Sequence, residues 1–144
     1  MTVAPAVIDT NVVVSGLLTG EPASPTAVVV EGMLRGRFTY LLSLELLAEY
    51  REVLLRPRIR RRHGLDADDV EALLTDLALN GSVRDPPRVA GAVPDLGDRH
   101  LWDLLQSEPN AVLVTGDGAL FDRAPAPGRV LSPRRFLSHL RENG

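Results

Sequence analysis

Short apolar runs alternate along the chain with segments whose apolar residues recur at helical spacing. The runs Ala6–Ile8, Phe38–Leu42, Ala111–Thr115 and Arg129–Leu131 predict strands, and Ser82–Arg84 is a weaker candidate. Strands that alternate with helices are typical of a parallel sheet covered by helices. The pattern therefore predicts an α/β fold.

Capping residues mark where the helices are expected to begin. Ser24, Ser43 and Asp66 each precede a periodic segment, and Pro57 ends the segment that follows Ser43. Asn80 and Gly81 end the segment after Asp66. The predicted helices cover about residues 25–34, 44–55, 66–79, 98–107 and 133–140. The length of 144 residues, without repeats or an evident linker, predicts one domain over residues 1–144.

The composition excludes several kinds of chemistry. The chain has no cysteine, which rules out disulfides and thiol nucleophiles, and all 16 basic residues are arginine. Without lysine, a Walker-type phosphate loop or a Schiff-base enzyme is not expected. No run approaches the roughly 20 apolar residues of a membrane span, and Met1–Asp9 does not resemble a signal peptide. We expect a cytoplasmic protein without a membrane segment.

Two aspartates follow apolar strands. Asp9 comes directly after Val7-Ile8, and Asp117 lies between Gly116 and Gly118 just after the strand that ends at Thr115. In open parallel sheets, ligands bind beyond the carboxyl ends of the strands, so both carboxylates are candidates for a site. The alternative is that each carboxylate only accepts hydrogen bonds from turn amides.

Two further acids lie on predicted helices. Glu49 is at the border of the apolar face of its helix, whereas most carboxylates on helix flanks are simply solvated. Asp98 lies on the same side as the apolar residues three and seven positions later, although it could equally be an N-cap. Asp95 is a secondary candidate, and Asp103 is expected at the surface. The three histidines, His63, His100 and His139, are expected to be incidental.

Carboxylates that meet repel one another unless a cation neutralises them. Oxygen ligands without cysteine or histidine favour Mg²⁺ or Mn²⁺, which can activate water and offset charge during phosphodiester cleavage. An acidic pocket repels a polyanion, so separate cationic side chains would have to bind it. One run of basic residues is a candidate for that role, and the alternative is that this run is only a solvated surface. That run consists of Arg56, Arg58, Arg60, Arg61 and Arg62, and Arg134-Arg135 is a second candidate.

Four segments together resemble the motifs of PIN domains. They are Val7–Asn11, Leu42–Leu54, Asp95–Leu101 and Leu113–Asp117, and the similarity covers nearly the whole chain. Each segment is a weak signal alone, but four in the same order are specific. The third segment departs from the usual pattern, because Leu96 stands where a proline is more common.

The resemblance implies a three-layer sandwich with a five-stranded parallel sheet of order 3-2-1-4-5. It also implies metal-dependent cleavage of RNA, often by the toxin of a toxin–antitoxin pair, with an antitoxin partner and a homodimer. By matching position, the acidic site would be Asp9, Glu49, Asp98 and Asp117. Asn11, Ser43 and Thr115 would orient those carboxylates or a water.

Two alternatives to a nuclease stay open. A phosphatase or phosphoacceptor domain also places an aspartate after its first strand, but such folds generally use a lysine that this chain lacks. A PIN fold could also bind RNA or act as a scaffold without cleaving it. Such members usually lack one of the acids, and all four positions are acidic in this chain.

Overall fold

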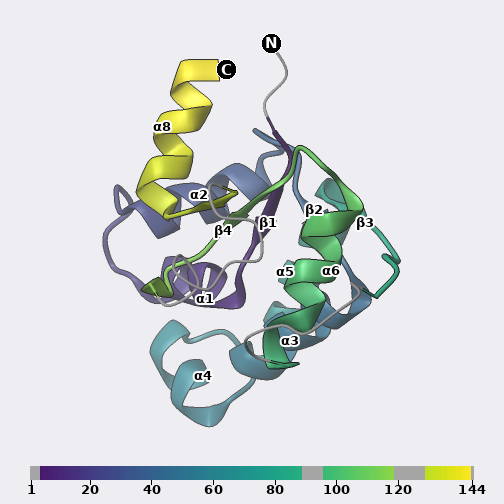
Figure 1. The fold of residues 1–144 in the computed structure, drawn as a ribbon. Helices are drawn as coiled ribbons and strands as arrows, with labels where there is room; N and C mark the ends of the chain where they lie inside the picture. The colour runs from purple at the N-terminus through teal and green to yellow at the C-terminus, as the bar shows by residue number, and fades with distance from the viewer. Residues whose placement is uncertain (1–3, 89–95, 119–128, 144) are drawn as a thin grey trace.

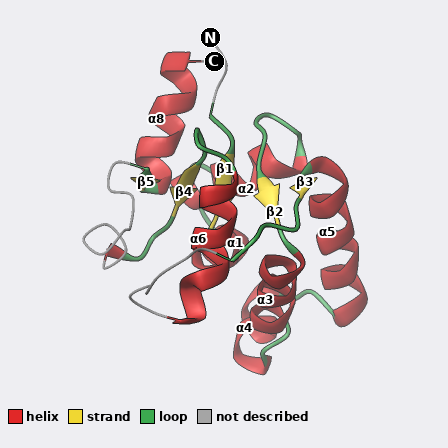
Figure 2. Ribbon diagram, turned by 45° about the vertical axis from the view of Figure 1, so that its right-hand side comes forward, coloured by secondary structure: helices red, strands yellow, loops and turns green. Residues whose placement is uncertain are grey.

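The computed structural model of the chain describes residues 4–88, 96–118 and 129–143. Within these residues, short parallel strands lie between helices, as Figure 1 shows. Helix α6 (Arg99–Ser107) lies in front of β1 and β4 in Figure 2, and α1 (Thr10–Leu18) and α2 (Pro25–Leu34) lie behind them. The predicted α/β fold with parallel strands is confirmed.

The strands of the described residues form two parallel sheets. They are β1 (Ala6–Ile8), β2 (Leu41–Leu42), β3 (Ser82–Val83), β4 (Val112–Val114) and β5 (Val130–Leu131). Strand β4 pairs with β1 on one side and β5 on the other, and β2 pairs with β3. A single parallel bridge joins Ala6 to Tyr40, just before β2. The ladders thus give a three-stranded and a two-stranded sheet, so the order 3-2-1-4-5 in one sheet stays a prediction.

The second strand is shorter than predicted, because it begins at Leu41 rather than Phe38. Phe38 and Tyr40 are nevertheless buried. The Phe38 ring packs edge-on against Phe136 with ring centroids 5.0 Å apart, and the Tyr40 hydroxyl donates to the Leu77 carbonyl at 2.7 Å. These aromatic side chains pack in the core without extending the strand, which explains why the strand was predicted to begin too early.

The remaining helices agree with the predicted segments to within a few residues. They are α3 (Leu44–Leu54), α5 (Ala67–Asn80) and α8 (Pro133–Asn143), together with α6, which a 3₁₀ turn over Leu96–Asp98 precedes. The predicted caps are confirmed for three helices. Ser24 accepts from Ala27 N, Ser43 accepts from Leu46 N, and Asp66 forms a capping box with Asp69.

Helix α1 was not predicted from the sequence. Its residues Val12, Val13 and Val14 are β-branched and favour strands, and a Ser-Gly pair such as Ser15-Gly16 is more typical of a turn. Packing decides otherwise, since all three valines are buried. At Gly16 a Cβ atom would lie only 2.6 Å from the Thr26 carbonyl oxygen. Glycine therefore permits α1 and α2 to pack closely, so Gly16 serves the helix pair rather than a turn.

The arginine run forms a helix of its own, α4 (Pro57–His63). Pro57 does end the preceding segment, but it also occupies the first turn of α4, where a missing amide hydrogen costs little. Gly64 ends α4 in the left-handed conformation, with φ of 73°. No residue of α4 is buried. This helix is therefore a charged element at the surface, below α1 and beside α3 in Figure 1.

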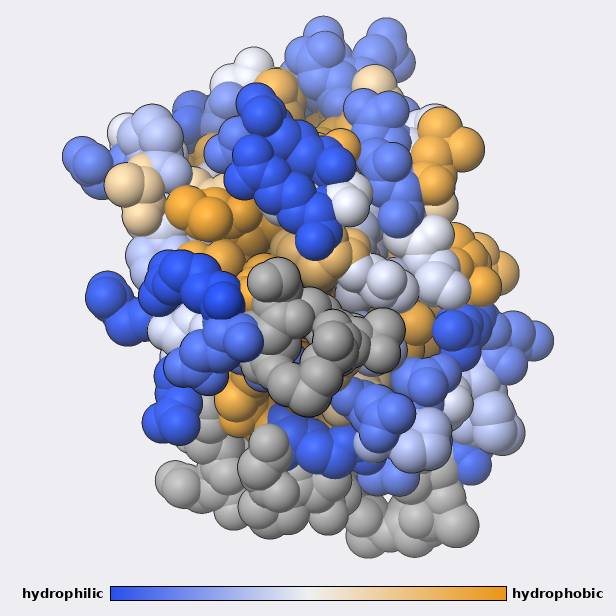
Figure 3. All heavy atoms as spheres, turned by 90° about the horizontal axis from the view of Figure 1, so that it is seen from above, coloured by the Kyte–Doolittle hydropathy of each residue, from blue (hydrophilic) through white to orange (hydrophobic). Residues whose placement is uncertain are grey.

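The buried apolar side chains of the described residues form one cluster that includes both sheets. Seen from above, with the chain ends toward the viewer, the surface is largely hydrophilic with apolar residues showing between the polar ones (Figure 3). Among the described residues, no helix has the length and hydrophobicity required to cross a bilayer.

Candidate active site

The site is built at the carboxyl ends of two paired strands. Ile8 of β1 is in register with Val114 of β4, so the next residues, Asp9 and Thr115, are neighbours. The Asp9 amide donates to the Val114 carbonyl at 2.9 Å, which fixes the backbone there. The Thr115 hydroxyl then donates to Asp9 Oδ2 at 2.8 Å. Parallel register thus places a hydroxyl donor on the first aspartate.

Asn11 on α1 holds both Asp9 and the loop after β4. Its side-chain nitrogen donates to Asp9 Oδ2 at 3.1 Å, and its side-chain oxygen accepts from the Gly116 amide at 3.0 Å. The Asp117 amide donates to the Thr115 hydroxyl at 3.0 Å. The backbone that carries Asp117 is therefore fixed to the same two side chains that hold Asp9.

Burial changes the acidity of Asp9, which is 7% exposed. Burial raises the pKa of the Asp9 carboxyl above its usual value, the hydrogen bond from Thr115 opposes this, and the negative charge of Glu49 raises the pKa further. Keeping the Asp9 carboxyl charged in this position therefore costs free energy. A cation beside Asp9 would remove that cost.

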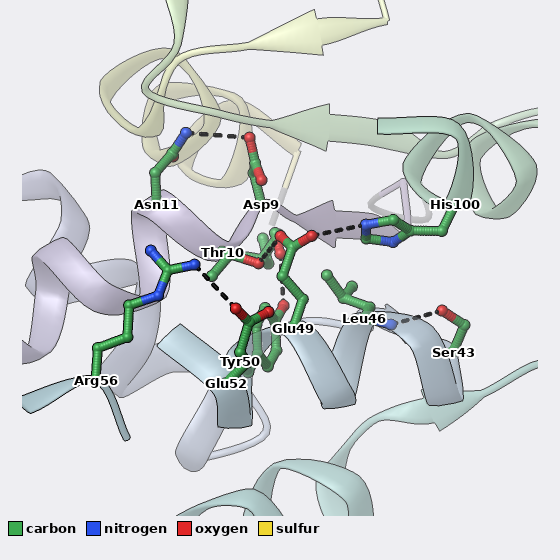
Figure 4. A network of polar contacts seen from close by, with 11 residues as sticks. Asp9, Thr10, Asn11, Ser43, Leu46, Glu49, Tyr50, Glu52, Arg56 and His100 are labelled. Carbon is green, nitrogen blue, oxygen red and sulfur yellow. Dashed lines mark hydrogen bonds and ion pairs between the residues drawn. The ribbon is translucent and has the colours of Figure 1, made fainter. Parts of the chain in front are cut away.

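Glu49 reaches this site from α3. The Tyr50 hydroxyl, buried beneath it, donates to the carbonyl of Ile8, the residue before Asp9, and so ties α3 to the end of β1. The Thr10 hydroxyl donates to Glu49 Oε1, and His100 Nε2 lies 2.9 Å from Glu49 Oε2. Figure 4 shows Glu49 between Thr10 and His100. Both carboxylate oxygens of Glu49 are therefore engaged.

The expectation that His100 is incidental is wrong. This residue of α6 is mostly buried and faces Glu49. Burial alone lowers the pKa of His100, but the hydrogen bond and the charge of Glu49 outweigh it, so the pKa is raised. The same contact is the main cause that lowers the pKa of Glu49. Both shifts favour a charged pair.

Asp103 also lies elsewhere than expected, because it is 7% exposed rather than on the surface. The sequence argument assigned one apolar face to α6. Instead, the six consecutive residues from His100 to Leu105 are buried, because neighbours surround this helix on several sides. The sequence of α6 separates an apolar side from a polar side that carries His100 and Asp103, and nothing in that pattern shows that the polar side is covered too.

The two other predicted acids are less buried than Asp9. Asp98 is half-buried and occupies the N-cap position of α6, as the N-cap alternative predicted, although its side chain accepts no capping hydrogen bond from that helix. Asp117 is exposed after β4. Ser43 is buried and caps α3. Asp95 lies outside the described residues.

The structure thus brings Asp9 and Glu49 together, linked through Thr10, and places Asp98 and Asp117 on the neighbouring chain segments. Within the described part of the chain, no three acidic or histidine side chains are arranged to hold a metal ion as they stand. The chemistry of the donor set still suits a hard cation. Asp9 supplies a buried carboxyl whose pKa is raised by burial, and the hydrogen bonds from Asn11 and Thr115 both go to Oδ2 rather than Oδ1.

Comparison with known proteins identifies the family to which the chain belongs. A family model described as "PIN domain" matches residues 5–119, which include the Asp9 strand, Glu49, His100 and Asp117. A comparison with curated proteins finds no match. Because the family model covers most of the 144 residues, the chain belongs to the PIN domain family, whose members are generally nucleases.

Proposed function

We propose that this chain is an endoribonuclease that depends on Mg²⁺ or Mn²⁺ and hydrolyses RNA phosphodiester bonds. The observation that carries the proposal is the buried Asp9 carboxylate, oriented by Thr115 and Asn11 and joined through Thr10 to Glu49. Membership of a nuclease family supports the same reaction class.

Asp9, Glu49, Asp98 and Asp117 would hold the cation. When bound, the metal ion would supply an activated water and offset the charge that develops on the phosphate. Since no three such side chains among the described residues are arranged around a metal ion, the proposal requires Asp98 or Asp117 to complete the set with Asp9 and Glu49 as the cation binds.

The protein contributes the fixed geometry around Asp9. Thr115 and Asn11 hold Oδ2, so Asp9 loses little freedom when it acts, and the same pair keeps the Asp117 backbone nearby. His100 and Thr10 orient Glu49. No side chain acts as a nucleophile in this reaction. Hydrolysis by water would leave a 5′-phosphate and a 3′-hydroxyl.

We further propose that the nuclease is cytoplasmic, acts as a homodimer and is the toxin of a toxin–antitoxin pair. These proposals rest on the resemblance of the four motif segments, and the antitoxin would be a separate small protein. Co-purification of the chain with the product of a neighbouring gene, followed by recovery of cleavage when that partner is removed, tests the toxin role. Cleavage by the chain that no neighbouring product inhibits would contradict it.

The central experiment measures cleavage of end-labelled RNA by the purified chain with Mn²⁺, with Mg²⁺ and after chelation. Asp9→Asn should abolish cleavage, whereas Asp76→Asn on the exposed face of α5 should not. Cleavage that survives both chelation and Asp9→Asn would sink the proposal. Retention of RNA binding without cleavage by the unaltered chain would instead favour a PIN fold that binds RNA only.

A further inference from the structure

A groove leads away from the site along α1. Its volume is about 540 Å³, and Thr10 and Asn11, which hold Glu49 and Asp9, line its inner end. Val14 and Leu18 follow Thr10, and Ser15 and Thr19 follow Asn11, at spacings of four residues, about one helical turn. At a rise of 1.5 Å per residue, Thr10 to Thr19 spans roughly 13 Å.

The groove combines an apolar floor with neutral polar groups. Val14 is buried, and Leu18 and Val53 of α3 are half-buried, so together they offer a surface on which a flat heterocycle can pack. The hydroxyl-bearing residues Thr10, Ser15 and Thr19 also line the groove. Apolar contact with hydroxyls beside it suits a nucleoside better than a purely apolar ligand.

Arg62 of α4 also lines this groove. It lines a second hollow as well, of about 560 Å³, together with Arg56 and Arg58. Arg56 forms an ion pair with Glu52 at 3.1 Å. Among the residues described here, no ion pair engages Arg58 or Arg62. A free guanidinium beside a groove is suited to bind a phosphate.

We infer that this groove binds one nucleotide of single-stranded RNA next to the bond that is cleaved. Its base would pack on Val14, Leu18 and Val53, its ribose hydroxyls would face Ser15 and Thr19, and its phosphate would pair with Arg62. The acidic site and Arg62 would then hold phosphates of the same strand. This inference rests on the proposed nuclease function and names how its substrate is bound.

Binding can be measured separately from cleavage. In an Asp9→Asn background, the anisotropy of a fluorescent single-stranded RNA of mixed sequence reports affinity without turnover. Arg62→Ala should weaken binding by roughly tenfold and make the dependence of log Kd on log salt less steep by about 0.7, since one phosphate contact is lost. Arg61→Ala removes the same charge from the same helix, but Arg61 does not line the groove, so its effect should be smaller.

A second variant tests the groove without altering charge. Ser15 is exposed and lines the groove, so Ser15→Trp should fill it and weaken RNA binding by roughly tenfold while thermal unfolding stays unchanged. Thr75→Trp, at an exposed position of α5, is the control for an added indole. If Arg62→Ala and Ser15→Trp bind as tightly as their controls, the inference is wrong. Equal affinity for DNA of the same sequence would overturn the assignment to RNA.

The results also separate this inference from the proposed function. Weaker binding by both variants, with no cleavage by the unaltered chain, would keep the groove and reject the nuclease. Metal-dependent cleavage that neither variant slows at low RNA concentration would keep the nuclease and reject the groove.

Discussion

Two regions of this molecule handle charge in opposite ways. At the end of β1, Asp9 is buried and accepts hydrogen bonds from Thr115 and Asn11. On α4, arginines lie at the surface of a helix that buries none of its residues. The region around Asp9 depends on the geometry of its hydrogen bonds, whereas α4 depends on how many charges it carries. Variants should therefore have large, salt-independent effects on the first region and small, salt-dependent effects on the second.

The largest effect after Asp9 itself should come from Thr115→Val. Valine has a similar shape but cannot donate to Asp9 or accept from the Asp117 amide, so both acids lose their orientation. We expect the rate of RNA cleavage to fall by about 10- to 100-fold and the free energy of unfolding to fall by about 1 kcal/mol. Single-turnover cleavage and urea denaturation measure the two.

Thr75→Val is the matched control, because Thr75 is exposed and its hydroxyl bonds only within α5. Cleavage by Thr115→Val at the rate of that control would show that Asp9 needs no orientation.

A smaller effect is expected from His100→Phe. Phenylalanine fills the same buried space but leaves Glu49 Oε2 without its partner, so Glu49 gains freedom. Cleavage should slow by roughly tenfold. His100→Gln, which keeps an N–H donor, should recover part of the loss. If phenylalanine and glutamine give the same rate, the contact with Glu49 is not what His100 contributes.

The contrast between the regions also explains what the sequence could predict. Strand ends are visible in sequence because apolar runs stop there, so Asp9 and Asp117 were predicted where the structure places them. Serine and aspartate caps act within one turn, and three of them were predicted with their helices. These features are local, and local physics is enough to find them.

What the sequence could not show depends on packing between distant elements. His100 and Glu49 are 51 positions apart, and only the placement of α6 against α3 brings them together. Val12 to Val14 prefer strands, but they form a helix because in that form all three are buried in the core. Such residues need the tertiary structure before their role can be assigned.

On α4, Arg60→Ala should have a modest effect on cleavage. The side chain is exposed and no residue of its helix is buried, so under the proposed function its contribution would be electrostatic attraction of RNA. We expect KM to rise by roughly threefold at low salt, kcat to stay constant, and unfolding free energy to change by less than about 0.5 kcal/mol. A fall in kcat that persists at high salt would show that this helix takes part in the geometry of the site.

The smallest effect should be a pH-dependent difference in stability between the unaltered chain and His100→Phe. The pKa of His100 is raised above its usual 6.5, so its contribution is complete below that pH and is lost as pH rises through the folded value. The pKa of Glu49 is lowered below its usual 4.5, so its contribution is present above that pH and is lost on acidification. The pair should therefore stabilise the fold most between those two values.

Urea unfolding at about pH 5.5 and about pH 8.5 measures this window, because only the first lies inside it. Asp9 is present in both proteins. Burial raises its pKa and favours its protonated form, so the contribution of Asp9 to stability also declines as pH rises. Comparing the two proteins cancels most of this contribution. The advantage of the unaltered chain over His100→Phe should shrink at the higher pH. A constant difference would mean that His100 stabilises the fold by packing alone, and that Glu49 is held in place by Thr10 rather than by an ion pair.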